Sequence, residues 1–380
     1  MNIISEKLLD TIKTNTEKIS NDINLGTFEY YYNIVRDFIA DNLIFIVIAY
    51  LFILPFIIRN LGFNFTTILI PPLLIIVYNA VKIALRTQFP FFNKLRSNQC
   101  LDKINHIIIN HTIKPIDSFL NKPLHEFIIS TSHNTYVPCN QNADVSSLEA
   151  IKRVLKMGAR VIELDVYAKH SGGNTDDDYI PVIAHGIEKP TGDIFTTNPI
   201  LFEDCIDTIV NFGFLTSDPL IVVLEINTNR LIPVQQKMKE IILRKLGNRL
   251  LDSSYKLNAP NRKLVTNENM QNLLNKVIFI GDGGKTSELD SVLDGIWGES
   301  NLRNHDAGDS ELKTLNLKGV LTRVYPSGNV NGNFSLNYDP TSLWNNRYNL
   351  VALNFQTFDS NLMKNVSMFK NKSFVHFSEL

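Results

Sequence analysis

The 380-residue chain is predicted to fold as an α/β barrel of alternating strands and helices, preceded by a hydrophobic helical hairpin. Three observations support this prediction. Strand-like and helix-like segments alternate after residue 123, polar side chains follow several of the strands, and two uncharged stretches lie in the N-terminal third. In parallel α/β barrels the reactive groups lie at the C-terminal ends of the strands. The pattern therefore also predicts which end of the barrel carries a site.

The composition is that of a globular chain. The hydrophobic fraction is 44% and the formal net charge is −1, so neither disorder nor a general nucleic-acid-binding surface is supported. The cysteines Cys100, Cys139 and Cys205 are widely spaced and form no CxxC pattern. We therefore expect neither a disulfide framework nor a zinc site, which fits a reducing compartment.

The N-terminal third contains the predicted hairpin, residues 42–83, between a polar segment (1–41) and a connecting segment (84–122). Residues 42–58 and 60–81 carry no charge and are separated only by Arg59, and each run is just long enough to span a bilayer, which needs roughly 20 apolar residues. Lysines and arginines flank the pair, which predicts that both termini face the cytosol. We expect an integral or monotopic membrane protein with its catalytic domain on the cytosolic face. A buried helical hairpin of a soluble domain is the alternative.

The elements of the predicted barrel follow in order from residue 123. Strands are expected at 125–131, 160–167, 181–185, 220–226, 276–282, 319–326 and 349–356, and helices at 146–158, 201–214, 234–251 and near 343–346. Gly158 is expected to end the first helix. Residues 283–318 are acidic, show no clear periodicity and are expected to form a linker. This alternation predicts a parallel sheet closed into a barrel.

Acidic side chains at strand ends predict a metal site. Glu163 and Asp165 lie two residues apart on one strand and therefore share a face, Glu225 ends another strand, and Asn134 supplies an amide oxygen. Oxygen donors of this kind suit Ca²⁺, completed by water or substrate. The alternative is that the Glu163–Asp165 pair serves a structural ion pair with Arg160 or Arg153.

Two histidines accompany these acids. His133 follows one predicted strand and His185 ends another, and they are a natural acid/base pair, although a histidine at such a position often has only a structural role. No serine or cysteine lies in a nucleophile elbow. A metal with two histidines and no such nucleophile indicates cleavage of a phosphodiester rather than acyl transfer.

The segments that carry these residues resemble a known family. ISTSHNTY, SSLEAIKRVLKMGARVIELDVY and PVIAHG resemble the X half of eukaryotic-type phosphoinositide-specific phospholipase C, and LTRVYPSGN, LNYDPTSLWN and YNLVALNFQTFD resemble its Y half. The resemblance covers roughly residues 116–377. It implies a distorted TIM-like barrel built from an X half (123–282) and a Y half (319–380) joined by the linker, without the usual PH, EF-hand and C2 modules.

The resemblance also implies the chemistry. The family cleaves membrane inositol phospholipid with Ca²⁺, releasing diacylglycerol and passing through a cyclic inositol phosphate. By motif position, Asn134, Glu163, Asp165 and Glu225 resemble the Ca²⁺ ligands. Glu163 is also a candidate base for the 2-hydroxyl, with Glu225 as the alternative base. His133 resembles the residue that stabilises the pentacovalent phosphorus, and His185 the general acid that later acts as base. The bilayer and an inositol phospholipid are the implied partners, and no nucleic acid is expected.

The headgroup positions match in part. Arg323 and Tyr325 resemble the residues that hold the inositol headgroup, and Lys189 is a further candidate for binding phosphate. Two lysines usual in the family are replaced here by Ile280 and Asp282. We therefore expect phosphatidylinositol or its monophosphate to be preferred over the bisphosphate. A metal-dependent glycerophosphodiesterase and a catalytically silent membrane lipid-binding scaffold are the alternatives.

Overall fold

The described part of the chain folds around a sheet of parallel strands. The computed structural model describes residues 100–108, 112–139, 145–172, 175–187, 194–195, 197–327 and 336–380. The predicted hairpin (42–83) and Lys189 lie outside the described residues. The strands are β1 (Phe127–Ile129), β2 (Thr131–Ser132), β3 (Val161–His170), β4 (Tyr179–Ile183), β5 (Gly186–Ile187), β6 (Ile194–Phe195), β7 (Ile200–Leu201), β8 (Leu220–Asn227), β9 (Val277–Gly283), β10 (Gly295–Ile296), β11 (Leu302–Asp306), β12 (Leu321–Tyr325), β13 (Leu350–Leu353) and β14 (Phe374–His376).

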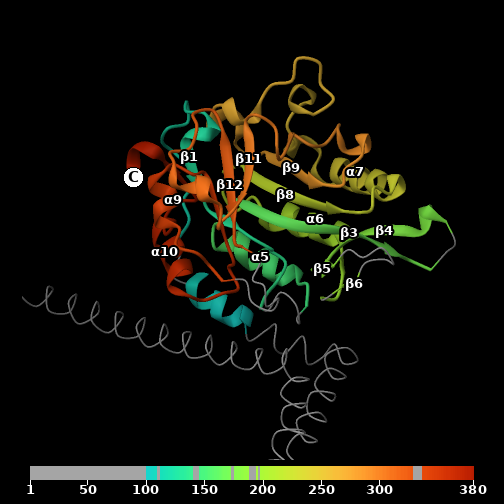
Figure 1. The fold of residues 1–380 in the computed structure, drawn as a ribbon. Coiled ribbons are helices and arrows are strands. Elements are labelled where there is room, and N and C mark those ends of the chain that lie inside the picture. The colour runs from blue at the N-terminus through green and yellow to red at the C-terminus, as the bar shows by residue number, and fades with distance from the viewer. Residues whose placement is uncertain are drawn as a thin grey trace, which may run out of the picture. The chain divides into compact units, whose positions relative to one another are not determined.

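Helices lie between successive strands and cover the outside of the sheet (Figure 1). The α-helices are α5 (Leu148–Lys156), α6 (Phe202–Phe212), α7 (Ile232–Leu246), α8 (Met270–Leu273), α9 (Thr341–Asn345) and α10 (Ser360–Met368). Short 3₁₀ helices are η1 (Leu124–Glu126), η2 (Asp176–Asp178), η3 (Gly247–Arg249), η4 (Ser253–Tyr255), η5 (Val265–Asn267), η6 (Ser287–Leu289), η7 (Ser310–Lys313) and η8 (Phe377–Glu379).

The order of the strands is that of a nearly closed barrel. The main path runs β10-β9-β8-β3-β2-β13-β12-β11, and each pairing along it is parallel. β3, β8 and β9 are rich in valine, isoleucine and leucine because both of their faces are buried, as in parallel sheets covered by helices. The prediction of an α/β barrel is therefore confirmed.

The inside of the barrel is layered. Alternate residues of neighbouring strands, including Val161, Ile221, Ile278, Leu321 and Leu350, form one buried apolar cluster. Because side chains alternate across a strand, the residues two and four positions further along point to the same interior. These later positions carry mostly polar side chains. The apolar layer thus supports a polar layer at the C-terminal ends of the strands.

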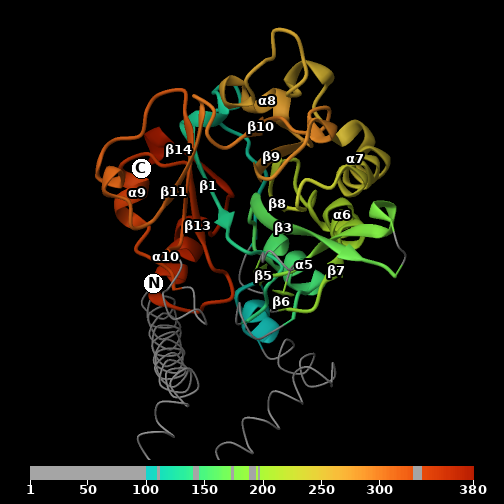
Figure 2. The same cartoon turned by 45° about the vertical axis from the view of Figure 1, so that its right-hand side comes forward.

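The opposite end of the barrel is closed by β1 and β14. They pair antiparallel, with Phe127 opposite His376, and β1 also lies against β13 (Figure 2). The rings of Phe127 and Phe374 meet edge to face at 6.2 Å, inside the same apolar cluster. Burial of such aromatic pairs is a large hydrophobic contribution to stability.

The first helix shows how local sequence sets an element's limits. α5 begins after Ser147, whose side chain accepts a hydrogen bond from the Ala150 N–H. The helix ends before Gly158, as predicted. Gly158 has φ +93°, and a Cβ added to it would lie 2.7 Å from Cδ1 of Ile113. Only glycine fits both the left-handed backbone and that contact.

Residues 283–318, expected to form a linker, contribute two strands to the barrel. β10 extends the sheet beyond β9, and β11 pairs along its whole length with β12. Their sequences, GI and LRNHD, are too short and too polar to show a strand period. Pairing with neighbouring strands, which sequence periodicity does not report, therefore determines these two elements.

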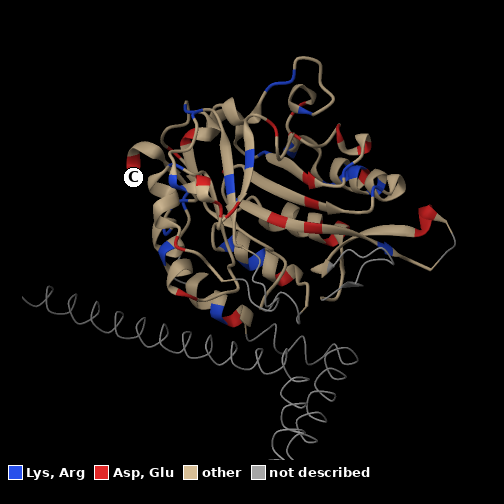
Figure 3. Ribbon diagram, in the orientation of Figure 1, with Lys and Arg blue, Asp and Glu red and all other residues tan. Residues whose placement is uncertain are grey.

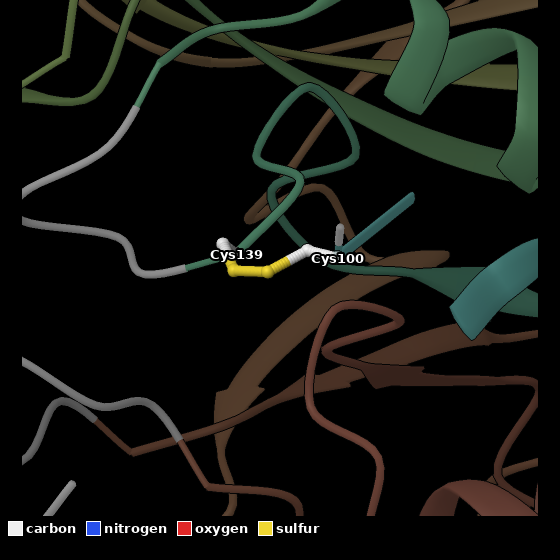
Figure 4. The surroundings of a disulfide bond; sticks show 2 residues. All are labelled: Cys100 and Cys139. Atoms are coloured by element: carbon white, nitrogen blue, oxygen red, sulfur yellow. A yellow bond between two sulfur atoms is a disulfide. The ribbon is translucent and has the colours of Figure 1, made fainter. Parts of the chain in front are cut away.

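The structure corrects the expectation that the cysteines are unpaired. Cys100 and Cys139 form a disulfide, with Cα atoms 5.8 Å apart and a sequence separation of 39 (Figure 4). The bond joins the helical residues 100–108 to the segment that follows β2. Spacing alone could not predict it because folding brings the two segments together. Cys205 is free and buried in α6.

The predicted localisation is also corrected. Among the described residues, no helix has both the length and the apolar character needed to cross a bilayer, which contradicts the expected integral or monotopic membrane protein. The reason is visible in α5 and α6, which bury one face and carry charged residues on the other. The two uncharged runs that motivated the prediction lie outside the described residues.

Candidate active site

The polar layer of the barrel brings acids from adjacent strands into one row. Asp165 of β3 lies opposite Glu225 of β8, and Glu225 lies opposite Asp282 of β9. Figure 3 shows acidic positions on the neighbouring strands β3 and β8 and basic positions toward β12. Side chains in register on adjacent parallel strands lie within reach of one another. The row is therefore a direct consequence of strand alignment.

Three carboxylates form a cluster at this level. Glu163, Asp165 and Glu225 each offer a ligand atom, and these atoms all lie within 4.8 Å of one another. Glu163 and Asp165 are 3% and 4% exposed. Asp165 Oδ1 is buried without a hydrogen-bond partner, while its Oδ2 accepts a 2.8 Å bond from the Tyr136 hydroxyl. Acids this close repel unless a cation joins them.

Burial and mutual repulsion shift the acids' pKa values upward. Burial is the main cause that raises the pKa of Asp165 well above its ordinary value, and the charges of Glu225 and Glu163 add to it. Burial also raises the pKa of Glu225, with Glu163 adding to the effect. These shifts measure how unfavourable the ionised cluster is in the absence of a positive charge.

Glu163 behaves differently because positive groups surround it. Burial would raise its pKa, but Arg323, His133 and the Asn134 N–H together lower it below the ordinary value. Arg323 Nη2 donates to Glu163 Oε1 at 2.5 Å, and the Asn134 N–H donates to Oε2 at 3.0 Å. Glu163 is thus ionised and held on both oxygens.

Asn134 is placed beside Glu163 by a strained backbone. It has φ +44°, a left-handed conformation that asparagine tolerates better than most residues, and it is 4% exposed. This turn directly follows His133 at the end of β2. The same turn therefore sets the positions of His133 and Asn134. It is also attached to β3, because the Thr135 hydroxyl accepts a hydrogen bond from the Glu163 N–H.

His133 lies between an acid and an amide. Its Nδ1 lies 2.8 Å from Asn354 Oδ1, so Nδ1 carries a proton and donates, and its Nε2 lies 3.7 Å from Glu163 Oε2. Burial lowers the pKa of His133 most strongly; Glu163 raises it and Arg323 lowers it further. A neutral His133 would therefore present its Nε2 lone pair toward the acid cluster.

His185 follows β4 on the same side of the barrel. Its backbone N–H donates to Thr197 Oγ1 at 2.8 Å, which fixes the turn after the strand. Burial lowers its pKa to about 4, with the charge of His133 adding to the effect and Glu163 opposing it. That His133 and Glu163 both act on His185 is evidence that the three groups share one site.

Arg323 and Tyr325 lie on β12, across the barrel from the acids. Arg323 is 3% exposed, and its guanidinium carbon lies 5.3 Å from the centroid of the Tyr325 ring. Arg323 Nη1 donates to Asn304 Oδ1 at 3.2 Å. The guanidinium is thus held between Glu163 and Asn304. Lys189, the third headgroup candidate, lies outside the described residues.

The alternative of a structural ion pair with Arg160 or Arg153 does not describe these acids. Arg160 faces Asp218 at 4.0 Å, and Arg153 pairs with Glu149 at 3.0 Å. The partner of Glu163 is Arg323, which lies 160 residues further along the chain. The sequence could not reveal this pairing because it depends on β12 closing the barrel opposite β3.

Several polar neighbours are absent from the expected set. Asn354 accepts a hydrogen bond from His133, and Tyr136 donates one to Asp165. Asn304 links Arg323 to Asp282. Asn354 follows β13, so the rule that found His133 and His185, a polar residue directly after a strand, could have found it. Asn304 carried no such signal because its strand, β11, was not recognised.

The donor set fits a divalent cation with oxygen ligands. Three carboxylates converge, one of their buried oxygens has no hydrogen-bond partner, and Asn134 adjoins them. Ca²⁺ prefers carboxylate and amide oxygens, whereas zinc sites draw on cysteine and histidine. Binding the cation there would have to compete with the Arg323 ion pair for Glu163.

Comparison with known proteins assigns the chain to a family. Residues 120–281 match the family model "Phosphatidylinositol-specific phospholipase C, X domain", and residues 297–375 match the corresponding Y domain. The two matches together cover more than half of the chain. The chain belongs to the phosphatidylinositol-specific phospholipase C family.

Individual relatives cover shorter stretches. The 1-phosphatidylinositol 4,5-bisphosphate phosphodiesterase delta-4 of Homo sapiens is 34% identical over 147 residues, which are 39% of this chain and 17% of that protein. Phosphodiesterase 1 of Saccharomyces cerevisiae is 34% identical over 131 residues, 34% of this chain and 13% of that protein. The chain thus matches only a small part of these relatives' length.

A solved structure shares the fold. The crystal structure of L. pealei PLC21 superposes with a TM-score of 0.54 at 20% identity, over 68% of this chain and 37% of that chain. At this identity the likeness concerns the barrel itself.

Proposed function

We propose that the chain is a Ca²⁺-dependent phospholipase C that cleaves inositol phospholipid to diacylglycerol and inositol phosphate through a cyclic phosphodiester. The observation that carries the proposal is the buried cluster of Glu163, Asp165 and Glu225, with an unpartnered oxygen, next to His133 and His185. The proposed ligands are these three acids and Asn134. When bound, the cation would lower the pKa of the attacking hydroxyl and offset the phosphate charge.

The first chemical step needs a base and an acid. The inositol 2-hydroxyl attacks the 1-phosphate, forming a new P–O bond while the P–O bond to diacylglycerol breaks. Glu163, kept ionised by Arg323, is the candidate that accepts the hydroxyl proton. His185 gives a proton to the departing diacylglycerol oxygen. The anionic phosphodiester raises the pKa of His133, so that its Nε2 takes up a proton and donates a hydrogen bond to the phosphoryl oxygens as charge develops.

The low pKa of His185 is compatible with this role. In the absence of substrate, burial and His133 keep the ring neutral near pH 7. An anionic phosphodiester beside it adds the negative charge that raises a histidine pKa. In the second step the neutral ring accepts a proton from the water that attacks the cyclic phosphate. The P–O bond to the inositol 2-oxygen breaks, and Glu163 returns its proton to that oxygen. His185 is then protonated and Glu163 ionised for the next cycle.

The charges around Arg323 support a headgroup with few phosphates. Four carboxylates lie near the one guanidinium of Arg323: those of Glu163, Asp165, Glu225 and Asp282. When all of them are ionised, a bound divalent cation and Arg323 together do not exceed their negative charge. Additional ring phosphates would meet this negative field. The relatives are named for the 4,5-bisphosphate, but this chain has Asp282 at the edge of the row, and we propose a preference for phosphatidylinositol or its monophosphate.

The reaction is tested by release of labelled inositol phosphate from phosphatidylinositol in mixed micelles. We expect release with Ca²⁺ and its loss in EGTA. We also expect a fall of at least about 100-fold in His185→Ala, the size typical of removing a catalytic acid or base, and weaker Ca²⁺ dependence in Asp165→Asn, which removes a proposed ligand. No release from any inositol lipid would favour the scaffold alternative. Release only from water-soluble glycerophosphoinositol would favour the glycerophosphodiesterase.

The headgroup preference is tested separately. Turnover of phosphatidylinositol, its monophosphate and the bisphosphate is compared at equal mole fraction in the same micelles. A higher kcat/KM for the bisphosphate than for the other two lipids would contradict the preference while leaving the phospholipase C reaction in place.

A further inference from the structure

The barrel has one opening in its strand pairing, between the edges formed by β9–β10 and by β11. In the described part of the chain no strand pairing joins these two edges. β10 pairs with β9, at Ile280 and Gly281, and not with β11. We refer to this opening as the seam. A cavity of about 700 Å³ lies along it, lined by residues of both edges that include Asp282, Trp297 and Asn304. The seam thus adjoins the acid row.

Asn304 bridges the seam with its side-chain amide. Its Nδ2 donates a long hydrogen bond of 3.4 Å to Asp282 Oδ2 on β9, and its Oδ1 accepts from Arg323 Nη1 at 3.2 Å. The amide suits this position because it is neutral and offers one donor and one acceptor to two oppositely charged partners. A carboxylate in its place would repel Asp282, and an apolar side chain would leave both partners without this bond.

The bridge continues into the acid cluster. Arg323 contacts Asn304 with one terminal nitrogen and Glu163 with the other, while its buried Nε has no hydrogen-bond partner. Two terminal contacts fix the plane of a guanidinium, which is rigid and planar. Strand register agrees, since Asn304 lies opposite Arg323 on the adjacent strand. Asp282, Asn304, Arg323 and Glu163 therefore form one chain of contacts from the seam to the cluster.

We infer that Asn304 is a positioning residue that fixes both Arg323 and Asp282 and so determines which inositol headgroups enter the site. The inference rests on the proposed function. It assigns Arg323 to the part of the headgroup nearest the cluster. It also places a fixed carboxylate, Asp282, at the seam, where free ring hydroxyls can donate to it and ring phosphates are repelled.

The test compares Asn304→Leu with a matched control, Asn301→Leu. Asn301 lies just before the same strand, is 7% exposed and donates to Thr266 Oγ1, away from the acid row. Both changes replace an asparagine amide by an apolar side chain of similar size, and Asn301 is buried whereas Asn304 is half-buried. Removal of hydrogen bonds to charged groups predicts that Asn304→Leu lowers kcat/KM for phosphatidylinositol about 10-fold, mainly through KM. It also predicts that the preference over the bisphosphate falls about 3-fold or more.

A double-mutant cycle separates positioning from simple damage to the fold. If Asn304 acts on selectivity through Asp282, then Asn304→Leu changes the lipid preference much less in an Asp282→Ala background. Equal effects of Asn304→Leu and Asn301→Leu on KM and on lipid preference would overturn the inference. So would full additivity of Asn304→Leu and Asp282→Ala on that preference.

A binding measurement keeps the inference testable if turnover is absent. Calorimetry of inositol 1-phosphate with the full chain should show weaker affinity for Asn304→Leu than for Asn301→Leu. Unchanged affinity in both, or no binding to the unmodified protein, would overturn the inference. Absence of turnover together with the expected binding pattern would instead count against the proposed reaction.

Discussion

His185 shows how one buried residue links the fold to pH. Its pKa is lowered to about 4 from an ordinary value of 6.5, mainly by burial and then by His133. Between these two values the unfolded chain binds a proton at this residue and the folded chain does not. The folded state therefore loses stability as pH falls through this range, and it retains the full contribution above about 6.5.

A variant isolates this contribution. As pH falls from 7 to 4.5, we expect the unfolding free energy of the unmodified protein to decrease relative to that of His185→Gln. Urea unfolding at several pH values measures it. Because other carboxyl groups titrate in both proteins, only the difference is informative. A difference that stays constant with pH would show that His185 is not held neutral by the fold.

Glu163 shows that one residue can have several partners that belong to different elements. It accepts hydrogen bonds from Arg323 of β12 and from the Asn134 N–H in the turn after β2, and the charge of His133 lowers its pKa. Its position on β3 follows from a two-residue period in the sequence. Its ionisation state follows from neighbours far away in the chain, so a sequence pattern can identify Glu163 as a candidate but not its charge.

At the level of elements, the edge at β9 and β10 depends on a buried ion pair. Lys256 is 4% exposed and its Nζ lies 2.7 Å from Asp294 Oδ1, while Asp294 Oδ2 accepts from the Phe279 N–H of β9. The Asp294 N–H in turn donates to the Phe279 carbonyl at 2.8 Å. Asp294 thus attaches the segment before β10 to the sheet.

Removing the positive partner should destabilise this edge. Lys256→Met would leave Asp294 buried and without its ion-pair partner, which costs about 3–5 kcal/mol in comparable pairs. Lys285→Met is the control, because the Lys285–Asp290 pair has the same 2.7 Å distance but is more exposed, and such pairs contribute about 1 kcal/mol or less. Chemical denaturation compares the two. Similar losses in both variants would contradict the structural role of Asp294.

For the molecule as a whole, the disulfide between Cys100 and Cys139 connects the helical residues 100–108 to the segment that carries Asn134 and Tyr136. Cys139 lies three residues after Tyr136, whose hydroxyl donates to Asp165. The covalent link therefore holds a segment of the candidate site from outside the barrel. Linking residues across a stretch of this length restricts the unfolded chain.

Loss of the link should be measurable. A closed stretch of 39 residues predicts a stabilisation of about 4 kcal/mol by the chain-entropy relation. Cys139→Ser should lower the thermal midpoint, and a reducing agent should lower that of the unmodified protein but not of the variant. Cys205→Ser provides the control, since Cys205 is unpaired. A midpoint of the unmodified protein that is insensitive to reductant would contradict a stabilising disulfide.

The sequence by itself determined the local features of this protein. Strand and helix periods predicted the barrel, Gly158 marked the end of α5, and polar residues at strand ends identified His133, Glu163, Asp165, His185 and Glu225 as candidates. These signals are local because an element's period, its ends and its buried face are set by residues close together in the chain.

The tertiary structure decided the partners. The row from Asp165 to Asp282, the contact of Arg323 with Glu163, the bridge by Asn304 across the seam and the pairing of Cys100 with Cys139 all join residues from separate elements. Strands β10 and β11 exist because neighbouring strands supply their hydrogen bonds. Such features depend on which strands become adjacent and in what register, and no period within a single segment encodes that information.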